Sequence, residues 1–234
     1  MDPWRSDGDL FALARRELFT AVVGDVMDTM NLRHQFLPPA IRPLDNDMVL
    51  IGRAMPVLEA DVFDDASGDA ARVEGAPVAG QPFGLMFRAL DDLRPHEVYI
   101  CTGASPCYAL WGELMTIRAM KLGAAGAVVD GYARDTRGIR RLGFPSFGHG
   151  AYAQDQGPRG KVVDFRLPLE IGRVRVEPGD VVFGDLDGVC VVPADAVQEV
   201  FRRALEKVRG EHIVRRALEE GMSTADAFST YGIM

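Results

Sequence analysis

Two short segments hold the side chains best suited to chemistry. One is Trp111-Gly-Glu-Leu-Met115, at the expected start of a helix, and the other is Val128-Val-Asp-Gly-Tyr-Ala-Arg-Asp135, at the expected end of a buried strand. In α/β sheets, ligands bind beyond the carboxyl ends of the strands, where helix amino termini also point. We therefore expect both segments to open onto one crevice.

The first segment could bind an anion. The backbone amides in the first turn of a helix have no partner within the helix, and a glycine lets a ligand approach them closely. The expected cradle consists of Gly112, Glu113, Leu114 and Met115. The alternative is an ordinary helix start, in which Glu113 only interacts favourably with the helix dipole.

The adjacent Arg134 and Asp135 suit a bound oxo acid. A guanidinium can pair with a carboxylate through two hydrogen bonds, and an aspartate can ligate a hard cation such as Mg²⁺. The alternative is a surface salt bridge in which Asp135 caps the helix expected to start at Thr136. The residue types alone leave both interpretations open.

Several other chemistries lack support in the sequence. A Schiff-base enzyme needs a lysine in its pocket, and none of the three lysines lies in either segment. The three cysteines include no CxxC pair, and the four histidines lack the spacing of zinc ligands. The sequence has no GxSxG and no GxxxxGK[ST], so it does not indicate a serine hydrolase or a P-loop NTPase. The lysines are Lys121, Lys161 and Lys207.

Hydrophobic periodicity predicts the elements that position these segments. The middle of the chain alternates strand and helix, which favours parallel pairing, and the later short strands are joined by hairpin turns. Before them we expect a helix over 9–30 that is interrupted near Gly24, and a bulge or bend at Gly52 between two strands. The expected strands are 48–51, 54–58, 98–101, 125–129, 144–147, 174–176, 181–183 and 189–192; the expected helices are 112–122, 136–142 and 194–220; residues 59–83 are expected to be loop, and 223–234 a tail.

The predicted fold class is therefore α/β. We expect one compact domain over residues 1–234, with a mixed, layered β-α-β core of the swivelling β/β/α type, antiparallel hairpins, and helices at both ends. The C-terminal helix and tail, 194–234, carry more apolar side chains than a terminal segment usually exposes, so we expect them to contribute to oligomer contacts.

Composition limits the partners. The 234 residues carry a formal net charge of −8, which argues against nucleic acid or an anionic membrane as the main partner. No stretch approaches the 18 apolar residues of a membrane span, and the first residues lack the pattern of a secretion signal. We expect a cytoplasmic protein.

Longer runs of sequence resemble a known family. They are GELMTIRAMKLGAAGAVVDGYARDTRGIRRLGFPSFGHG (112–150), PGDVVFGDLDGVCVVP (178–193) and the closing EEGMSTADAFSTYGIM. These runs resemble the regulator-of-ribonuclease-activity-A-like (RraA-like) family, which includes the 4-hydroxy-4-methyl-2-oxoglutarate aldolases. The resemblance covers most of residues 8–234 and is weakest over 59–83.

The resemblance implies a set of site residues. Gly112, Glu113, Leu114 and Met115 would form the substrate cradle, Arg134 would bind substrate, and Asp135 would hold a divalent cation partly through water. The cation is usually Mg²⁺, with Mn²⁺ possible, and the separation of 22 positions between Gly112 and Arg134 is that of the family.

The sequence departs from the family at one site position. The aldolases carry an acidic residue three positions after the aspartate, where this chain has Gly138. The missing carboxylate would alter how metal or water is positioned. The family site also takes a glutamate from a neighbouring subunit's C-terminal helix, for which Glu211 is the candidate and Glu206 the second choice.

The resemblance thus implies a metal-dependent lyase that acts on pyruvate-type 2-oxo acids through an enolate, as an aldolase or an oxaloacetate decarboxylase. Glu113 and Glu211 would orient the water that moves protons. A shared site implies a homotrimer or homohexamer. The alternative is a non-catalytic regulator that binds ribonuclease machinery, since the family also contains such proteins.

Overall fold

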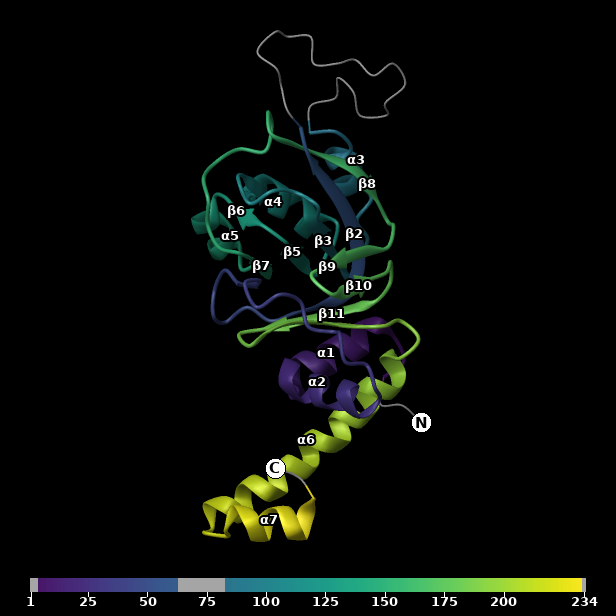
Figure 1. Ribbon diagram of the computed structural model, residues 1–234, viewed down its shortest axis with the longest axis vertical. Coiled ribbons are helices and arrows are strands. Elements are labelled where there is room, and N and C mark those ends of the chain that lie inside the picture. Colours follow the sequence, from purple (N-terminus) through teal and green to yellow (C-terminus); the bar gives the residue numbers. More distant parts are fainter. Residues whose placement is uncertain (1–3, 63–82, 233–234) are drawn as a thin grey trace.

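A curved mixed sheet forms the centre of the protein (Figure 1). The computed structural model describes residues 4–62 and 83–232. The strands lie in the order β1-β7-β5-β3-β2-β11-β12, and β8 also pairs with β2. Their bounds are β1 (Arg42–Pro43), β2 (Leu50–Asp61), β3 (Glu97–Thr102), β5 (Gly126–Val129), β7 (Ser146–Gly148), β8 (Gly160–Phe165), β11 (Val181–Asp185) and β12 (Gly188–Val192).

The sheet has a parallel half and an antiparallel half. Strands β2, β3, β5 and β7 pair in parallel, whereas β11 pairs antiparallel with both β2 and β12. The alternation of strand and helix in the middle of the chain and the hairpin of β11 and β12 are both confirmed. The hairpin expected between 174–176 and 181–183 is wrong, because Val174–Val176 pairs antiparallel with Leu169–Ile171. The mixed α/β fold class is confirmed with them.

Helices cover one face of the sheet. On the antiparallel half, α1 (Asp7–Glu17), α2 (Thr20–Thr29) and α6 (Val197–Glu219) pack against apolar side chains of β2, β11 and β12. On the parallel half, α3 (Met86–Asp91), α4 (Glu113–Lys121) and α5 (Thr136–Leu142) pack against alternate residues of β3 and β5. The intervening residues of these strands face a third cluster with β9 (Leu169–Ile171) and β10 (Val174–Val176). This period of two is expected for strands buried on both faces.

The N-terminal helix is divided at a different residue from the one predicted. The chain becomes extended at Leu18 and Phe19, between α1 and α2, while Gly24 lies inside α2. A Cβ atom on Gly24 would lie 2.5 Å from Cε2 of Phe36. The glycine is therefore needed for the close approach of this ring, and the prediction of a break at Gly24 is wrong.

Two predicted strands form one. Strand β2 runs without interruption through Gly52, where a Cβ atom would lie 2.4 Å from the backbone oxygen of His96. Its bulge lies instead between Leu58 and Glu59, opposite β8. The prediction of a loop over 59–83 is wrong for residues 59–61, which belong to β2. Residues 63–82 lie outside the described residues.

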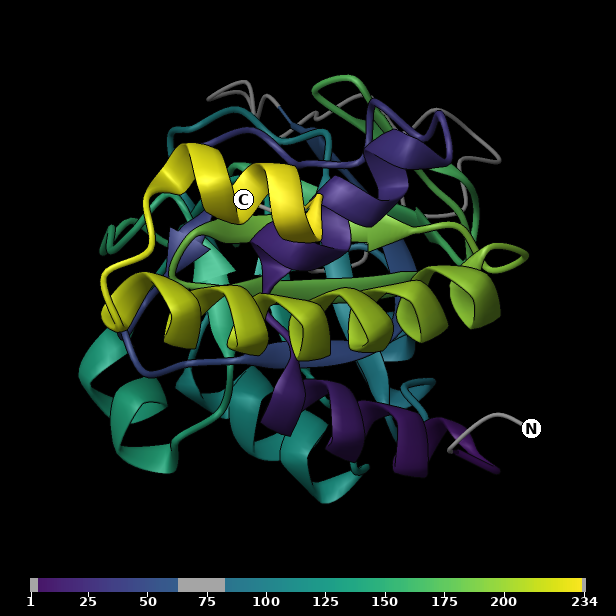
Figure 2. The ribbon, with the colours of Figure 1, turned by 90° about the horizontal axis from the view of Figure 1, so that it is seen from below.

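The predicted C-terminal tail contains a helix. Ser223 accepts a hydrogen bond from the amide of Asp226 and so caps α7 (Thr224–Tyr231), which packs on α6. Figure 1 shows that α7 and the end of α6 extend away from the sheet as an arm, and Figure 2 shows α7 beside α6 from below. Within the described ranges, no helix combines the length and apolar character that a membrane span requires.

Candidate active site

A small two-stranded sheet brings the two sequence segments together. Strand β4 (Ala109–Trp111) pairs in parallel with β6 (Tyr132–Ala133), and the amide of Arg134 donates to the Trp111 carbonyl at 2.8 Å. Gly112 and Asp135, which follow Trp111 and Arg134 in the chain, are therefore neighbours. A Cβ atom on Gly112 would lie 3.3 Å from Oδ2 of Asp135, so a larger residue at 112 would press on this carboxylate.

The start of α4 is held by a buried tryptophan. The indole of Trp111 donates to Oγ1 of Thr116 at 2.8 Å and packs between the rings of Tyr99 and Phe144. The amide of Thr116 donates to the Gly112 carbonyl at 3.0 Å and makes the first helical hydrogen bond. The amides of residues 113–115 precede this bond, so their N–H groups point out of the helix end, as an anion cradle requires.

Asp135 has the backbone conformation of a constrained site residue. Its φ is +56°, in the left-handed region that non-glycine residues rarely adopt, and its side chain makes no capping hydrogen bond to α5. The carboxylate instead lies 3.6 Å from Nε of Arg134. Of the alternative considered for this pair, the salt bridge is present but the side-chain cap is not, so the Asp135 carboxylate is not used by α5 and can reach a ligand.

Arg134 has a second partner that the sequence did not reveal. Its Nη1 donates to Oδ1 of Asp155, which follows β7 in a long connection to β8. Asp155 and Asp135 therefore flank the guanidinium and orient it. Nothing in the local pattern around Asp155 indicated this contact, because the residue belongs to no predicted element.

A buried carboxyl group lies behind the site. Nε2 of Gln156 donates to Oε2 of Glu59 at 2.7 Å, and Glu59 is only 2% exposed. Burial raises the pKa of Glu59 to about 8, against an ordinary value of 4.5, although the Gln156 hydrogen bond opposes the rise. The carboxyl group is therefore mostly protonated near neutral pH.

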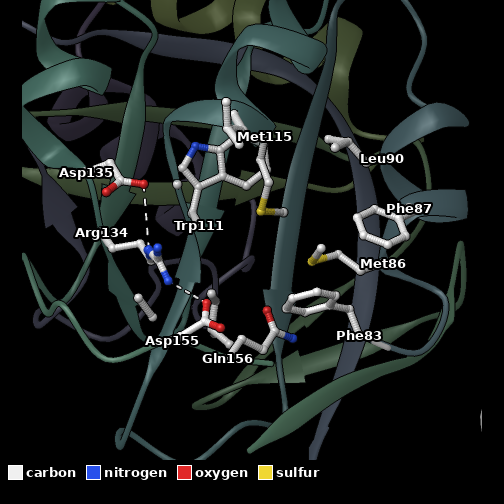
Figure 3. A pocket seen from close by; sticks show the side chains of 14 residues that line it. Phe83, Met86, Phe87, Leu90, Trp111, Met115, Arg134, Asp135, Asp155 and Gln156 are labelled. Atoms are coloured by element: carbon white, nitrogen blue, oxygen red, sulfur yellow. Dashed lines mark hydrogen bonds and ion pairs between the residues drawn. The ribbon is translucent and has the colours of Figure 1, made fainter. Parts of the chain in front are cut away.

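Residues of the two segments, together with Asp155, Gln156 and the α3 region, line a pocket of about 450 Å³, drawn in Figure 3. The charged groups of Arg134, Asp135 and Asp155 lie together on one side. Phe83, Met86, Phe87 and Leu90 lie across the pocket from these groups, with Trp111 and Met115 between them. The apolar wall is defined here as the large apolar side chains of the lining, which are Phe83, Met86, Phe87, Leu90, Leu110, Trp111, Leu114 and Met115. The predicted cradle residues Gly112, Leu114 and Met115 and the predicted Arg134 and Asp135 all contribute to the lining.

The side chain of Glu113 lies beside the described lining, against α5. It is not part of the pocket lining, and its carboxylate lies over Gly138 on α5. A Cβ atom on Gly138 would be 2.2 Å from Cδ of Glu113, so a side chain at 138 and this carboxylate compete for the same space. Nη2 of Arg141 is 3.6 Å from the carboxylate. An acidic group is therefore present where the aldolase pattern has its acidic residue, but it comes from α4.

The candidate glutamates of the C-terminal helix lie apart from this pocket. Glu211 is on α6, with Nζ of Lys207 3.7 Å from its carboxylate, and Glu206 pairs with Arg202 at 2.7 Å. Neither contributes to the described lining. Within one chain, α6 packs on α1 and α2 over the antiparallel half of the sheet.

The donor set is compatible with one hard divalent cation. Within residues 4–62 and 83–232, no three histidine, cysteine, aspartate or glutamate side chains cluster as a metal site. Mg²⁺ keeps several waters and is commonly held by one or two carboxylates together with substrate oxygens. Asp135 supplies such a carboxylate, and the pocket has room for water and substrate.

Comparisons with known proteins identify the family of this chain. A family model described as "RraA-like: Aldolase/RraA" matches residues 20–191. The chain is 28% identical over 214 residues to a protein of Halalkalibacterium halodurans named "Putative 4-hydroxy-4-methyl-2-oxoglutarate aldolase", and the match covers 91% of this chain and 90% of the relative. It is also 28% identical to "Protein DlpA" of Legionella pneumophila over 91% of this chain, which spans about a third (32%) of that longer protein.

A solved structure shares the fold. Streptomyces coelicolor RraAS2, described as an unusual member of the RNase ES inhibitor RraA protein family, superposes with a TM-score of 0.74 at 24% identity. The match covers 91% of this chain and 99% of RraAS2.

Proposed function

Since the chain belongs to the RraA-like family, described as Aldolase/RraA, we propose that it is a divalent-metal-dependent carbon–carbon lyase that acts on pyruvate-type 2-oxo acids. The reaction is aldol cleavage, decarboxylation of oxaloacetate, or both. One observation carries the proposal. The carboxylate of Asp135, the guanidinium of Arg134 and the start of α4 adjoin one another at a single pocket.

Substrate binding follows from these groups. The 2-oxo acid carboxylate accepts hydrogen bonds from Arg134 and from the amides at the start of α4, where the helix dipole also favours negative charge. Asp155 holds Arg134 in place from the other side. Asp135 would hold the metal ion, which when bound would supply positive charge beside the 2-keto oxygen.

The bond to C3 of the substrate then breaks. In aldol cleavage C3 separates from C4, and in oxaloacetate decarboxylation it separates from the departing carboxylate. The electron pair passes into the enolate of pyruvate, whose charge the fixed donors of the site stabilise, and a proton then returns to C3. Glu113 over Gly138, and Glu211 of a neighbouring chain, are the groups proposed to orient the water that moves this proton.

The test is a coupled assay. Purified protein is incubated with oxaloacetate and Mg²⁺ or Mn²⁺, and pyruvate is followed with lactate dehydrogenase. We expect pyruvate to form faster than with the metal alone, EDTA to remove the activity, and Arg134→Ala to abolish it. Borohydride with pyruvate should label no lysine, because none contributes to the described part of the lining.

The opposite result would favour the regulator alternative. If neither oxaloacetate nor 4-hydroxy-4-methyl-2-oxoglutarate is turned over above the metal background, the lyase proposal fails. A lysine labelled by borohydride would instead show an imine mechanism.

A further inference from the structure

The described pocket lining is strongly asymmetric in character. The charged side holds one cationic side chain, Arg134, and the two carboxylates Asp135 and Asp155. The apolar wall is contributed by Phe83, by α3, by β4 and by the first turn of α4. The two sides therefore suit different parts of one ligand.

The charge balance limits the number of carboxylates. Arg134 is shared between Asp155 and Asp135, and no second arginine or lysine contributes to the described lining. One divalent cation and Arg134 together offset Asp135, Asp155 and a single substrate carboxylate. A second carboxylate would lie against the apolar wall without a cation, which carries a large desolvation cost.

The apolar wall is also wide and partly open to solvent. Trp111, Met86 and Leu90 are buried, while Phe87 is 55% exposed and Leu114 is 80% exposed. Phe83 and Phe87 meet edge to face with 5.6 Å between ring centroids. Large apolar side chains grouped around a concave pocket are typical of sites that bind an apolar ligand group.

Building on the proposed lyase function, we propose that the substrate is a 4-hydroxy-2-oxo acid with a single carboxylate and an aromatic or branched aliphatic group at C4. The pyruvyl end would lie against Arg134 and Asp135, and the C4 substituent against the apolar wall. Cleavage breaks the C3–C4 bond. The C4 hydroxyl loses its proton and becomes the carbonyl of an apolar aldehyde, while C3 takes the electron pair and then a proton to give pyruvate.

A matched pair of uncleavable ligands tests binding without turnover. In 2-oxo-4-phenylbutanoate a phenyl ring replaces the distal carboxylate of 2-oxoglutarate. Isothermal titration with Mg²⁺ present should show the phenyl compound binding at least about tenfold more tightly, the scale of discrimination by an apolar pocket. Equal affinities, or tighter binding of 2-oxoglutarate, would overturn the inference.

Turnover should follow the same order. We expect kcat/KM for 4-hydroxy-2-oxo-4-phenylbutanoate to exceed that for 4-hydroxy-4-methyl-2-oxoglutarate by at least about tenfold. If oxaloacetate and the dicarboxylate aldol are cleaved while the phenyl aldol is not, the lyase function stands and this inference fails. If no 2-oxo acid is cleaved, the proposed function fails and this inference fails with it.

Variants locate the effect on the apolar wall. Phe87→Ser should lower kcat/KM for the phenyl aldol by about tenfold more than it lowers kcat/KM for oxaloacetate, whereas Phe87→Arg should shift preference toward the dicarboxylate. The matched control is Leu186→Ser, because Leu186 is 53% exposed and lies between β11 and β12, outside the described lining. If Phe87→Ser lowers the mass in light scattering, the wall is a contact between chains and the inference is wrong. The inference is also wrong if Phe87→Ser and Leu186→Ser have the same effect on the phenyl aldol.

Discussion

At the scale of single residues, Asp135 is the first position to test. Its left-handed backbone is one that asparagine also tolerates, so Asp135→Asn should keep the fold while removing the charge. We expect Mg²⁺ affinity to fall by at least about 10- to 100-fold, with a matching loss of metal-dependent turnover. Isothermal titration with Mg²⁺ or Mn²⁺ measures the metal affinity, and the melting temperature checks the fold. Unchanged affinity and rate would show that another group holds the metal.

The carboxylate over Gly138 gives a second residue-scale prediction. Glu113→Ala should lower kcat by about a hundredfold if this carboxylate orients water. Adding Gly138→Asp to that variant returns an acidic group to the vacated space and should recover part of the activity. Adding Gly138→Ala is the control, since it fills the space without a charge and should recover none. Equal rates for the two double variants would exclude a role for an acidic group there.

Glu59 predicts a pH dependence of stability. Its pKa is raised to about 8 in the folded protein, so the unfolded chain loses this proton first. The contribution of Glu59 to stability is therefore fully present below about pH 4.5 and is lost as the pH rises to about 8. Between pH 6 and pH 9 the loss is on the order of 2–3 kcal/mol.

Glu59→Gln removes the titrating group but keeps an oxygen that can accept from Gln156. Urea unfolding at pH 6 and pH 9 measures the free energy of unfolding. Between these pH values it should fall by about 2–3 kcal/mol less in Glu59→Gln than in the wild type. Glu219→Gln, at an exposed position of α6, is the control and should behave like the wild type. Identical pH dependence in Glu59→Gln and the wild type would contradict the raised pKa.

At the scale of elements, hydrophobic periodicity predicted the helices and strands whose boundaries depend on nearby residues in the chain. The core helices and strands of the middle region begin and end within about two residues of the prediction, because turn glycines and apolar repeats mark them clearly. The break near Gly24 was wrong because that glycine serves a tertiary contact with Phe36. Gly52 likewise accommodates the His96 carbonyl and does not bend β2.

The site was predictable only in part, for a related reason. The segments ending at Asp135 and starting at Trp111 were identified because strand ends and helix starts meet at one edge of an α/β sheet. The pairing of β4 with β6 and the contact of Asp155 with Arg134 join distant parts of the chain, and no local pattern encodes them. The apolar wall did carry a signal, since Phe83, Met86, Phe87 and Leu90 recur at helical spacing.

At the scale of the whole molecule, the C-terminal arm leaves apolar surface in water. Ile213 and Phe228 are each 58% exposed and Tyr231 is 37% exposed, on α6 and α7. A second chain packing on the arm would bury this surface. We expect light scattering to give a mass of three or six chains, and removal of residues 223–234 to reduce both mass and activity. A fully active 25.6-kDa monomer would contradict a shared site.

Mixing two inactive variants tests that shared site directly. If Glu211 acts in the pocket of a neighbouring chain, Arg134→Ala and Glu211→Gln proteins should each have low activity. In mixed oligomers, some pockets would combine an intact Arg134 from one chain with an intact Glu211 from another. Unfolding and refolding the two variants together should therefore restore activity. If equal amounts of the two chains mix at random, up to about a quarter of the pockets would contain both intact residues. Glu206→Gln in place of Glu211→Gln distinguishes the second candidate, and an absence of recovery in both mixtures would mean that each pocket is complete within its own chain.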